Sequence, residues 1–159
     1  MKRFLIFLAT IVAACALLCA CSQESSKSSA KSLGDVWDKI KSEVSFENFS
    51  EFDDAKKLSR NYGITEEMAD EFAGGVNKTG VNQEEIVLIK AKNSEYADDI
   101  EKKLNAKLQS KLNQNKNYNP EQAKMMDGCK VERNGLYVSL IVSENREKIT
   151  EIYKNELKL

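Results

Sequence analysis

The side chains that could perform chemistry are few, because the chain of 159 residues contains no histidine. Serine–histidine and cysteine–histidine nucleophile pairs are therefore excluded, and the usual histidine ligand of zinc is missing. A serine–lysine pair remains conceivable, because Ser139 and Lys90 lie on two predicted strands. A serine on one strand beside a lysine on another is far more often chance than catalysis. We therefore expect no enzymatic activity, no metal and no cofactor.

Acidic side chains gather at one place in the chain, at Glu66, Glu67, Asp70 and Glu71. A calcium loop needs oxygen ligands at fixed spacing around a glycine turn, and this cluster lacks that spacing. We interpret it as the solvated face of a predicted helix. The charge balance also argues against a nucleic-acid partner. Without Lys2 and Arg3 the chain carries 22 basic and 25 acidic side chains, and no basic patch stands out.

Cys21 has the most informative surroundings of the four cysteines. Two basic residues precede an uncharged apolar run over 4–18, which is the order found in secretory signals. The run ends in a motif that resembles the lipobox of bacterial lipoproteins, made of Leu18, Cys19, Ala20 and Cys21. The resemblance implies cleavage after Ala20 and a diacylglyceryl group, with chains such as palmitate, on the Cys21 sulfur. Two acyl chains anchor a protein stably, whereas one binds membrane only marginally.

Two other interpretations of this region are weaker. An uncleaved transmembrane helix over 4–21 would barely be long enough to span a bilayer. As other cleavage sites, Cys15 would leave a very short apolar core and Cys19 lacks a small residue before it. After cleavage at Cys21, Cys129 is the remaining cysteine and no intrachain disulfide can form. Cys129 is either a small buried hydrophobe beside a strand or, less often in such positions, a reactive thiol.

The chain divides into three parts. Residues 1–20 are the predicted lipoprotein signal peptide, and residues 21–32 form a flexible tether rich in serine. Residues 33–159 are long enough for a single domain and too short for two good cores. We expect this domain to stand at the outer face of the cell membrane, exported by the signal and held by the lipid.

Apolar residues at helical spacing predict three helices in the first part of the domain, over 34–44, 50–61 and 65–73. Trp37 lies in the first helix, where it is either a core anchor or a platform for a ligand. Gly63 is placed to stop the second helix in the left-handed conformation. The Gly74-Gly75 pair is expected to end the third helix.

Strands are predicted over 84–92, 129–134 and 136–143. The first is apolar on both faces and should be central in a sheet, and Asn134-Gly135 predicts a hairpin between the other two. Helices over 94–115, 120–126 and 144–157 complete the order, and Pro120 suits the first turn of its helix. The expected fold class is α+β, with a small antiparallel sheet of about three strands and helices mainly on one face.

Four stretches occur in an order that resembles a known family: Tyr62-Gly63-Ile64, residues 85–92, Tyr118-Asn119-Pro120-Glu121 and Gly135-Leu136-Tyr137-Val138. The chain is similar over 33–157 to an uncharacterised family of short cell-envelope lipoproteins from Gram-positive bacteria, described as a domain of unknown function. This resemblance implies an envelope lipoprotein and supplies no catalytic residue.

The resulting hypothesis is a membrane-anchored binding or accessory module that docks on another envelope protein. It rests on the lack of catalytic, metal-binding and phosphate-binding motifs, together with a tether that concentrates the domain near membrane partners. The alternative is a small-ligand binder with a single pocket. Its walls, or the partner surface, would include Trp37, Tyr118 and Tyr137. An enzyme is the least favoured function.

Overall fold

The computed structural model describes residues 31–159, which form five helices and five strands. The order along the chain is α2 (Leu33–Glu43), β1 (Phe49–Glu51), α3 (Ala55–Tyr62), β2 (Ala69–Asn77), β3 (Glu85–Ala91), α4 (Ser94–Tyr118), α5 (Pro120–Met126), β4 (Val131–Asn134), β5 (Tyr137–Val142) and α6 (Arg146–Leu157). The expected α+β class is confirmed, and the strand count of about three is wrong.

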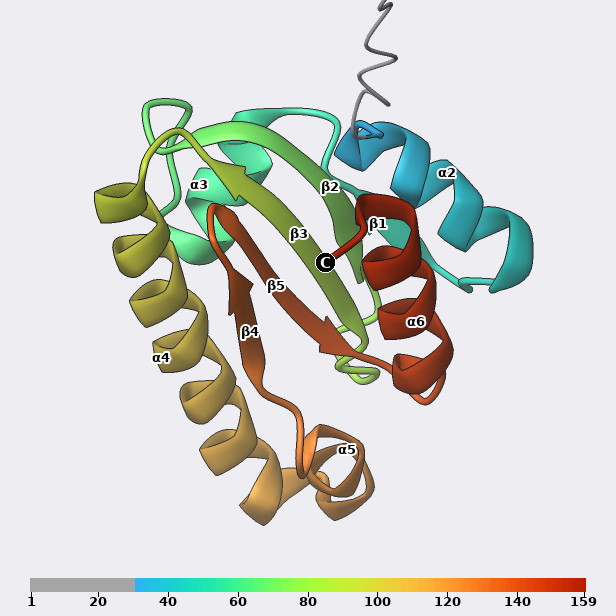
Figure 1. The fold of residues 1–159 in the computed structure, drawn as a ribbon. Coiled ribbons are helices and arrows are strands. Elements are labelled where there is room, and N and C mark those ends of the chain that lie inside the picture. The colour runs from blue at the N-terminus through green and yellow to red at the C-terminus, as the bar shows by residue number, and fades with distance from the viewer. Residues whose placement is uncertain (1–30) are drawn as a thin grey trace, which may run out of the picture.

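All five strands join one antiparallel sheet in the order β1-β2-β3-β5-β4 (Figure 1). β3 lies in the middle, as its two apolar faces predict, because Ile86 and Leu88 face one side while Val87 and Ile89 face the other. The hairpin between β4 and β5 is also confirmed. Its two-residue turn contains Gly135 at φ +60, a conformation that glycine adopts without steric cost.

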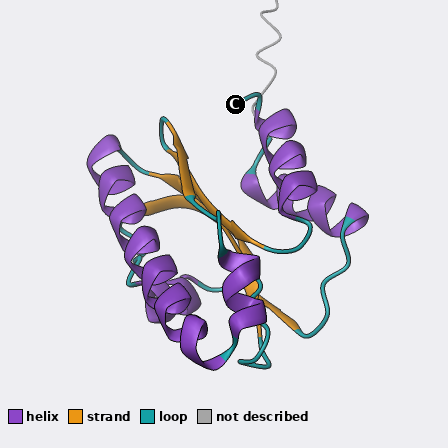
Figure 2. Ribbon diagram, turned by 90° about the horizontal axis from the view of Figure 1, so that it is seen from below, coloured by secondary structure: helices purple, strands orange, loops and turns teal. Residues whose placement is uncertain are grey.

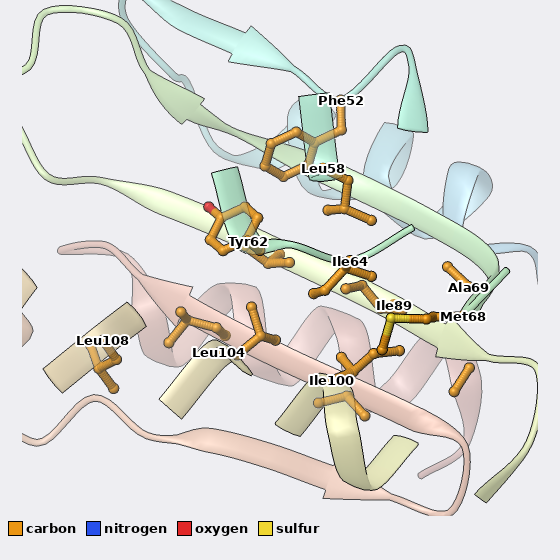
Figure 3. Packing of buried hydrophobic residues seen from close by; sticks show 14 of the residues in the cluster. Phe52, Leu58, Tyr62, Ile64, Met68, Ala69, Ile89, Ile100, Leu104 and Leu108 are labelled. Carbon is orange, nitrogen blue, oxygen red and sulfur yellow. The ribbon is translucent and has the colours of Figure 1, made fainter. Parts of the chain in front are cut away.

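Helices cover both faces of the sheet, which corrects the expectation that they lie mainly on one face. Figure 2 shows the sheet between two helical layers. On one side α3, α4 and α5 bury a core with β3 and β5, and part of this core is drawn in Figure 3. On the other side α2 and α6 bury a second core around Leu33, Ile40, Ile86 and Ile149. A central strand that is apolar on both faces requires such a second layer, because its outer side chains would otherwise face water.

The predicted helix over 65–73 is wrong, because most of it belongs to β2. Thr65 forms only a single turn with Met68, whose amide donates to the Thr65 carbonyl at 3.0 Å. The glycine pair continues the strand instead of ending a helix. A Cβ on Gly74 would lie 2.0 Å from the Ile86 carbonyl oxygen, and one on Gly75 would lie 2.3 Å from the Ser50 carbonyl oxygen. The two glycines therefore let β3 and β1 approach closely.

The predicted helix over 50–61 is wrong in its first turn. Residues Phe49–Glu51 form β1, and α3 begins only at Ala55 after the N-cap residue Asp54. The predicted stop is confirmed, since Gly63 caps α3 at φ +67. The long helix predicted over 94–115 extends to Tyr118, and Pro120 begins α5 as expected.

The signal peptide, the lipobox with Cys21, and all of the tether except residues 31 and 32 lie outside the described residues. Among the helices of the described range, none combines the length and the apolar character needed to cross a bilayer.

Candidate functional site

The three aromatic residues expected to form one surface lie in three different places. Trp37 belongs to the α2–α6 core and is only 4% exposed. Tyr137 begins β5 and lines a hollow beside Tyr153 and Lys154. Tyr118 ends α4 with 89% of its surface exposed. The structure therefore offers separate surfaces instead of one pocket walled by all three residues.

The first surface surrounds Tyr118. Val81, in the loop between β2 and β3, is 67% exposed, and these two are the exposed large hydrophobic residues of the described range. They lie in the same region, because the side-chain amide of Asn119, the residue after Tyr118, donates to the Val81 carbonyl at 3.5 Å. The Gln83 amide donates to the Gln122 side chain at 2.6 Å, which ties the same loop to α5. We call Val81, Tyr118 and Asn119 the distal surface.

The distal surface lies at the end of the domain opposite its N-terminal entry. The Leu33 amide donates to the Glu71 carboxylate at 2.8 Å, which fixes the start of α2 beside the start of β2. The loop that carries Val81 follows the other end of β2, after Asn77. Six residues of extended strand separate Glu71 from Asn77, or about 20 Å. In Figure 1 the chain accordingly enters at the opposite end from α5.

The second surface is a hollow of about 520 Å³ between α2, the segment 44–48 and β1. The Trp37 ring stacks on Phe49 with 5.8 Å between the ring centroids, and Phe46 lies 4.8 Å from Phe49 and 5.2 Å from Trp37. Polar side chains occur at its margin. We call this surface the aromatic hollow, defined by Trp37, Phe46, Phe49, Asn48, Glu51 and Lys78.

The third surface is a pair of adjoining hollows of about 390 and 310 Å³ between α6 and the β4–β5 hairpin. Both are lined by Ser139, which is 3% exposed. Its hydroxyl interacts with Tyr153, whose pKa is raised mainly by burial. Glu132 also lines both hollows, and its carboxylate forms an ion pair with the Lys154 ammonium at 2.7 Å. Arg146, Glu147 and Glu151 also line the first hollow, so this surface carries several charged side chains.

Lys90 does not act as a free base for Ser139. Its ammonium pairs with Asp70 at 2.7 Å and with Glu71 at 3.0 Å, and these bonds raise the pKa of Lys90 above its ordinary value. The lysine therefore holds its proton at neutral pH. The same bonds account for half of the acidic cluster, because the two carboxylates lie on β2 and serve this ion pair. Glu66 and Glu67 are exposed in the preceding turn.

Cys129 is a free, half-buried thiol between α5 and β4. Its sulfur accepts a hydrogen bond from the Arg146 guanidinium at 2.9 Å, and its thiol donates to the Met125 carbonyl oxygen at 3.5 Å. Arg146 is the first residue of α6, so the cysteine joins three elements of the fold. No group of three or more potential metal-binding side chains occurs within residues 31–159.

A buried carboxylate that the sequence pattern did not reveal lies under α4. Glu85 is 1% exposed, accepts a hydrogen bond from the Tyr62 hydroxyl at 2.8 Å and forms an ion pair with Lys111 at 3.0 Å. Both contacts use Oε2, and Oε1 has no hydrogen-bond partner. Burial, followed by the negative charge of Glu85, raises the pKa of Tyr62. The sequence could have predicted this burial, because Glu85 alternates with Val87 and Ile89 and therefore lies on the same inward face of β3.

The chain belongs to the DUF4358 family, a domain of unknown function, whose family model matches residues 42–143. This match confirms the expectation of an uncharacterised domain family. It includes all five strands and, of the three predicted aromatic residues, Tyr118 and Tyr137. No curated protein and no solved structure shows significant similarity to the chain.

Proposed function

We propose that this protein is a lipid-anchored binding module of the bacterial envelope, which docks on another envelope protein through its distal surface. Cys21 carries the lipid and holds the domain at the outer face of the cell membrane. The module has no catalytic role of its own. The observation that carries the proposal is the exposure of Tyr118 and Val81 in one region of the surface, which the hydrogen bond from Asn119 to Val81 holds together.

The exposure of Tyr118 and Val81 favours a binding partner, because the other large apolar side chains of the described residues are covered. Most large apolar side chains of residues 31–159 are buried or half-buried in the two cores. Tyrosine is enriched at protein interfaces, where its ring provides apolar contact and its hydroxyl can still form a hydrogen bond. A tyrosine side chain that is 89% exposed contributes little apolar burial to the folded domain, so its ring can be buried when a partner docks.

The position of the distal surface also suits a protein partner better than the membrane. The domain is entered beside Glu71, whereas Val81 and Tyr118 lie at the other end of β2 and α4. An anchor on the N-terminal side therefore leaves this end of the domain accessible to a neighbouring protein. The hydrogen bonds from Asn119 and Gln83 hold the loop in place, which lowers the entropy lost on binding.

The test is site-specific photo-crosslinking of the full-length lipoprotein in its own cells. A photoreactive phenylalanine analogue replaces Tyr118, and a matched control places it at Lys102, another exposed position on α4 whose side chain is 77% exposed. The two positions lie about 24 Å apart along the helix. We expect one envelope protein to crosslink at position 118 and not at position 102.

Two variants sharpen the result. Val81→Ser should reduce the crosslink from position 118 about fivefold or more, as expected for an apolar interface residue. Cys21→Ala should reduce it by releasing the domain from the membrane. Equal crosslinking at both positions, or none at position 118, would overturn the docking proposal. A crosslink that is unchanged by Cys21→Ala would overturn the role of the anchor.

A second proposed function, the binding of a small molecule, is favoured by a different observation. The aromatic hollow combines half-buried rings with polar side chains at its margin, which is the composition of small-molecule sites. A ligand-dependent shift in the thermal unfolding of the wild-type domain tests this function.

A further inference from the structure

We propose that the aromatic hollow is a saccharide-binding site, with a preference for neutral or singly anionic sugars. The inference names the ligand class for the small-molecule function and does not depend on the docking proposal. It rests on the ring cluster, on three polar groups at the rim and on the charge of the hollow.

The ring cluster supplies an apolar surface of the right shape. The three rings of Trp37, Phe46 and Phe49 form one compact cluster, in which each ring centroid lies 4.8–5.8 Å from the other two. Trp37 forms the buried part of this cluster, and the two phenylalanines are half-buried at the surface. A pyranose ring presents aliphatic C–H groups on its face, and these pack favourably against the electron-rich face of an aromatic ring.

The rim supplies hydrogen-bonding groups for the hydroxyls at the edge of a sugar. Glu51 Oε2 accepts from the Trp37 indole at 2.9 Å and from Lys41 at 3.1 Å. A carboxylate offers about four acceptor sites, so Glu51 keeps capacity for a ligand hydroxyl while it is held in place by the tryptophan. Its side chain is 49% exposed and therefore reachable.

Asn48 and Lys78 complete the rim from the facing segments. Asn48 has φ +52, in the left-handed region, and its carbonyl accepts the Lys78 amide at 2.8 Å. This backbone hydrogen bond holds the two segments together beside the rings. The hollow thus presents carboxylate, amide and ammonium groups from three segments around one apolar surface. Sugars need this mixture because each hydroxyl is both a donor and an acceptor.

The charge of the hollow narrows the ligand class. Lys41 and Lys78 contribute two positive charges and Glu51 one negative charge. Lys41 lies 5.8 Å from the centre of the Trp37 ring, so a cation already occupies that face. A cationic ligand would compete with Lys41 for the Trp37 ring and for Glu51. A neutral sugar, or one that carries a single carboxylate, meets no such competition.

The experiment uses the fluorescence of Trp37, which is the single tryptophan of the whole sequence. The full-length lipoprotein in detergent is titrated with tetra-N-acetylchitotetraose as a neutral probe and with galacturonate, which carries a single carboxylate, as an anionic probe. We expect a saturable change in Trp37 emission with at least one probe below about 5 mM. A linear or absent response to both probes would overturn the proposal, and the cluster would then serve only to hold β1 against α2.

Variants at the rim distinguish binding from indirect effects on the fluorescence. Glu51→Gln should weaken binding about tenfold to a hundredfold, because it removes a charge-assisted hydrogen bond at an exposed position. Asn48→Gly keeps the left-handed backbone and removes the amide, so it should fold normally and bind more weakly. Tyr118→Ser, outside the hollow, is the matched control and should bind like the wild type. Wild-type affinity in both rim variants would contradict the assignment.

Discussion

Replacing Lys111 by methionine should destabilise the domain strongly, because it leaves the buried Glu85 carboxylate without its counter-ion. Glu85 is 1% exposed, and Lys111 is 3.0 Å from its Oε2 atom with a side chain that is 17% exposed. Removing one partner of a buried ion pair costs about 3–5 kcal/mol. Since Lys111 retains some contact with water, we place the loss at the lower end of this range, near 3 kcal/mol.

The expected shift in melting temperature follows from the size of the domain. An unfolding entropy of about 2.1 cal/mol/K per residue gives roughly 270 cal/mol/K for a domain of this length. A loss of about 3 kcal/mol then lowers the midpoint by about 11 °C. Thermal and urea unfolding, followed by circular dichroism on the full chain in detergent, measure this change directly.

A double-mutant cycle separates the ion pair from simple loss of packing. Glu85→Met alone removes the buried charge, and the combination with Lys111→Met replaces the pair by two apolar side chains. Such replacements are often nearly neutral, so the double variant should be more stable than Lys111→Met alone. If Lys111→Met lowers the midpoint by less than about 3 °C, or if the two effects simply add, Glu85 does not depend on Lys111 and the reasoning fails.

Three further changes have defined outcomes. Gly74→Ala should cost about 2 kcal/mol or more in urea unfolding, because its Cβ would meet the Ile86 carbonyl, whereas Gly128→Ala, with no neighbour within 4 Å, should cost about 1 kcal/mol. The pKa of Lys90 is raised in the folded state, so its ion pairs stabilise the fold fully below about pH 10.5 and lose this effect as the pH rises further. The thermal unfolding midpoint should therefore fall above this pH, and it should fall less in the Lys90→Gln variant. Cys21→Ala should abolish labelling by radioactive palmitate and release the chain from the membrane fraction.

The elements that the sequence predicted well are those set by local chemistry. The two-sided apolar pattern of Ile86–Ile89 placed β3 at the centre of the sheet. Gly63 and Pro120 marked the end of α3 and the start of α5, because each residue has a backbone preference that suits one position. The hairpin after Asn134 needed only its own turn residues.

The elements that were predicted wrongly depend on partners far away in the chain. Met68, Ala69 and Phe72 have helical spacing, yet they are followed by Gly74, which is required by contact with Ile86 on β3. A glycine in a strand and a glycine after a helix look alike in the sequence. The same holds for β1, whose three residues become a strand only by pairing with β2.

The residues of the candidate site could likewise be named from the sequence, whereas their exposure and their neighbours depend on the fold. Tyr118 could be named from the sequence as an aromatic residue in a polar segment, but its 89% exposure required the fold. Trp37 was left open between core anchor and ligand platform. The structure places it in the core with its indole nitrogen bonded to Glu51, so its edge still borders the aromatic hollow.

The two proposed surfaces share one loop, and this has a consequence for how they can be used. Lys78 begins the segment that joins β2 to β3 and borders the aromatic hollow, while Val81, three residues later, belongs to the distal surface. Lys78 and Val81 therefore lie on the loop at the end of β2 away from Leu33, while the hollow extends from this loop to Trp37, about one turn of α2 from Leu33. A partner that contacts Val81 would thus lie close to a sugar held beside Lys78.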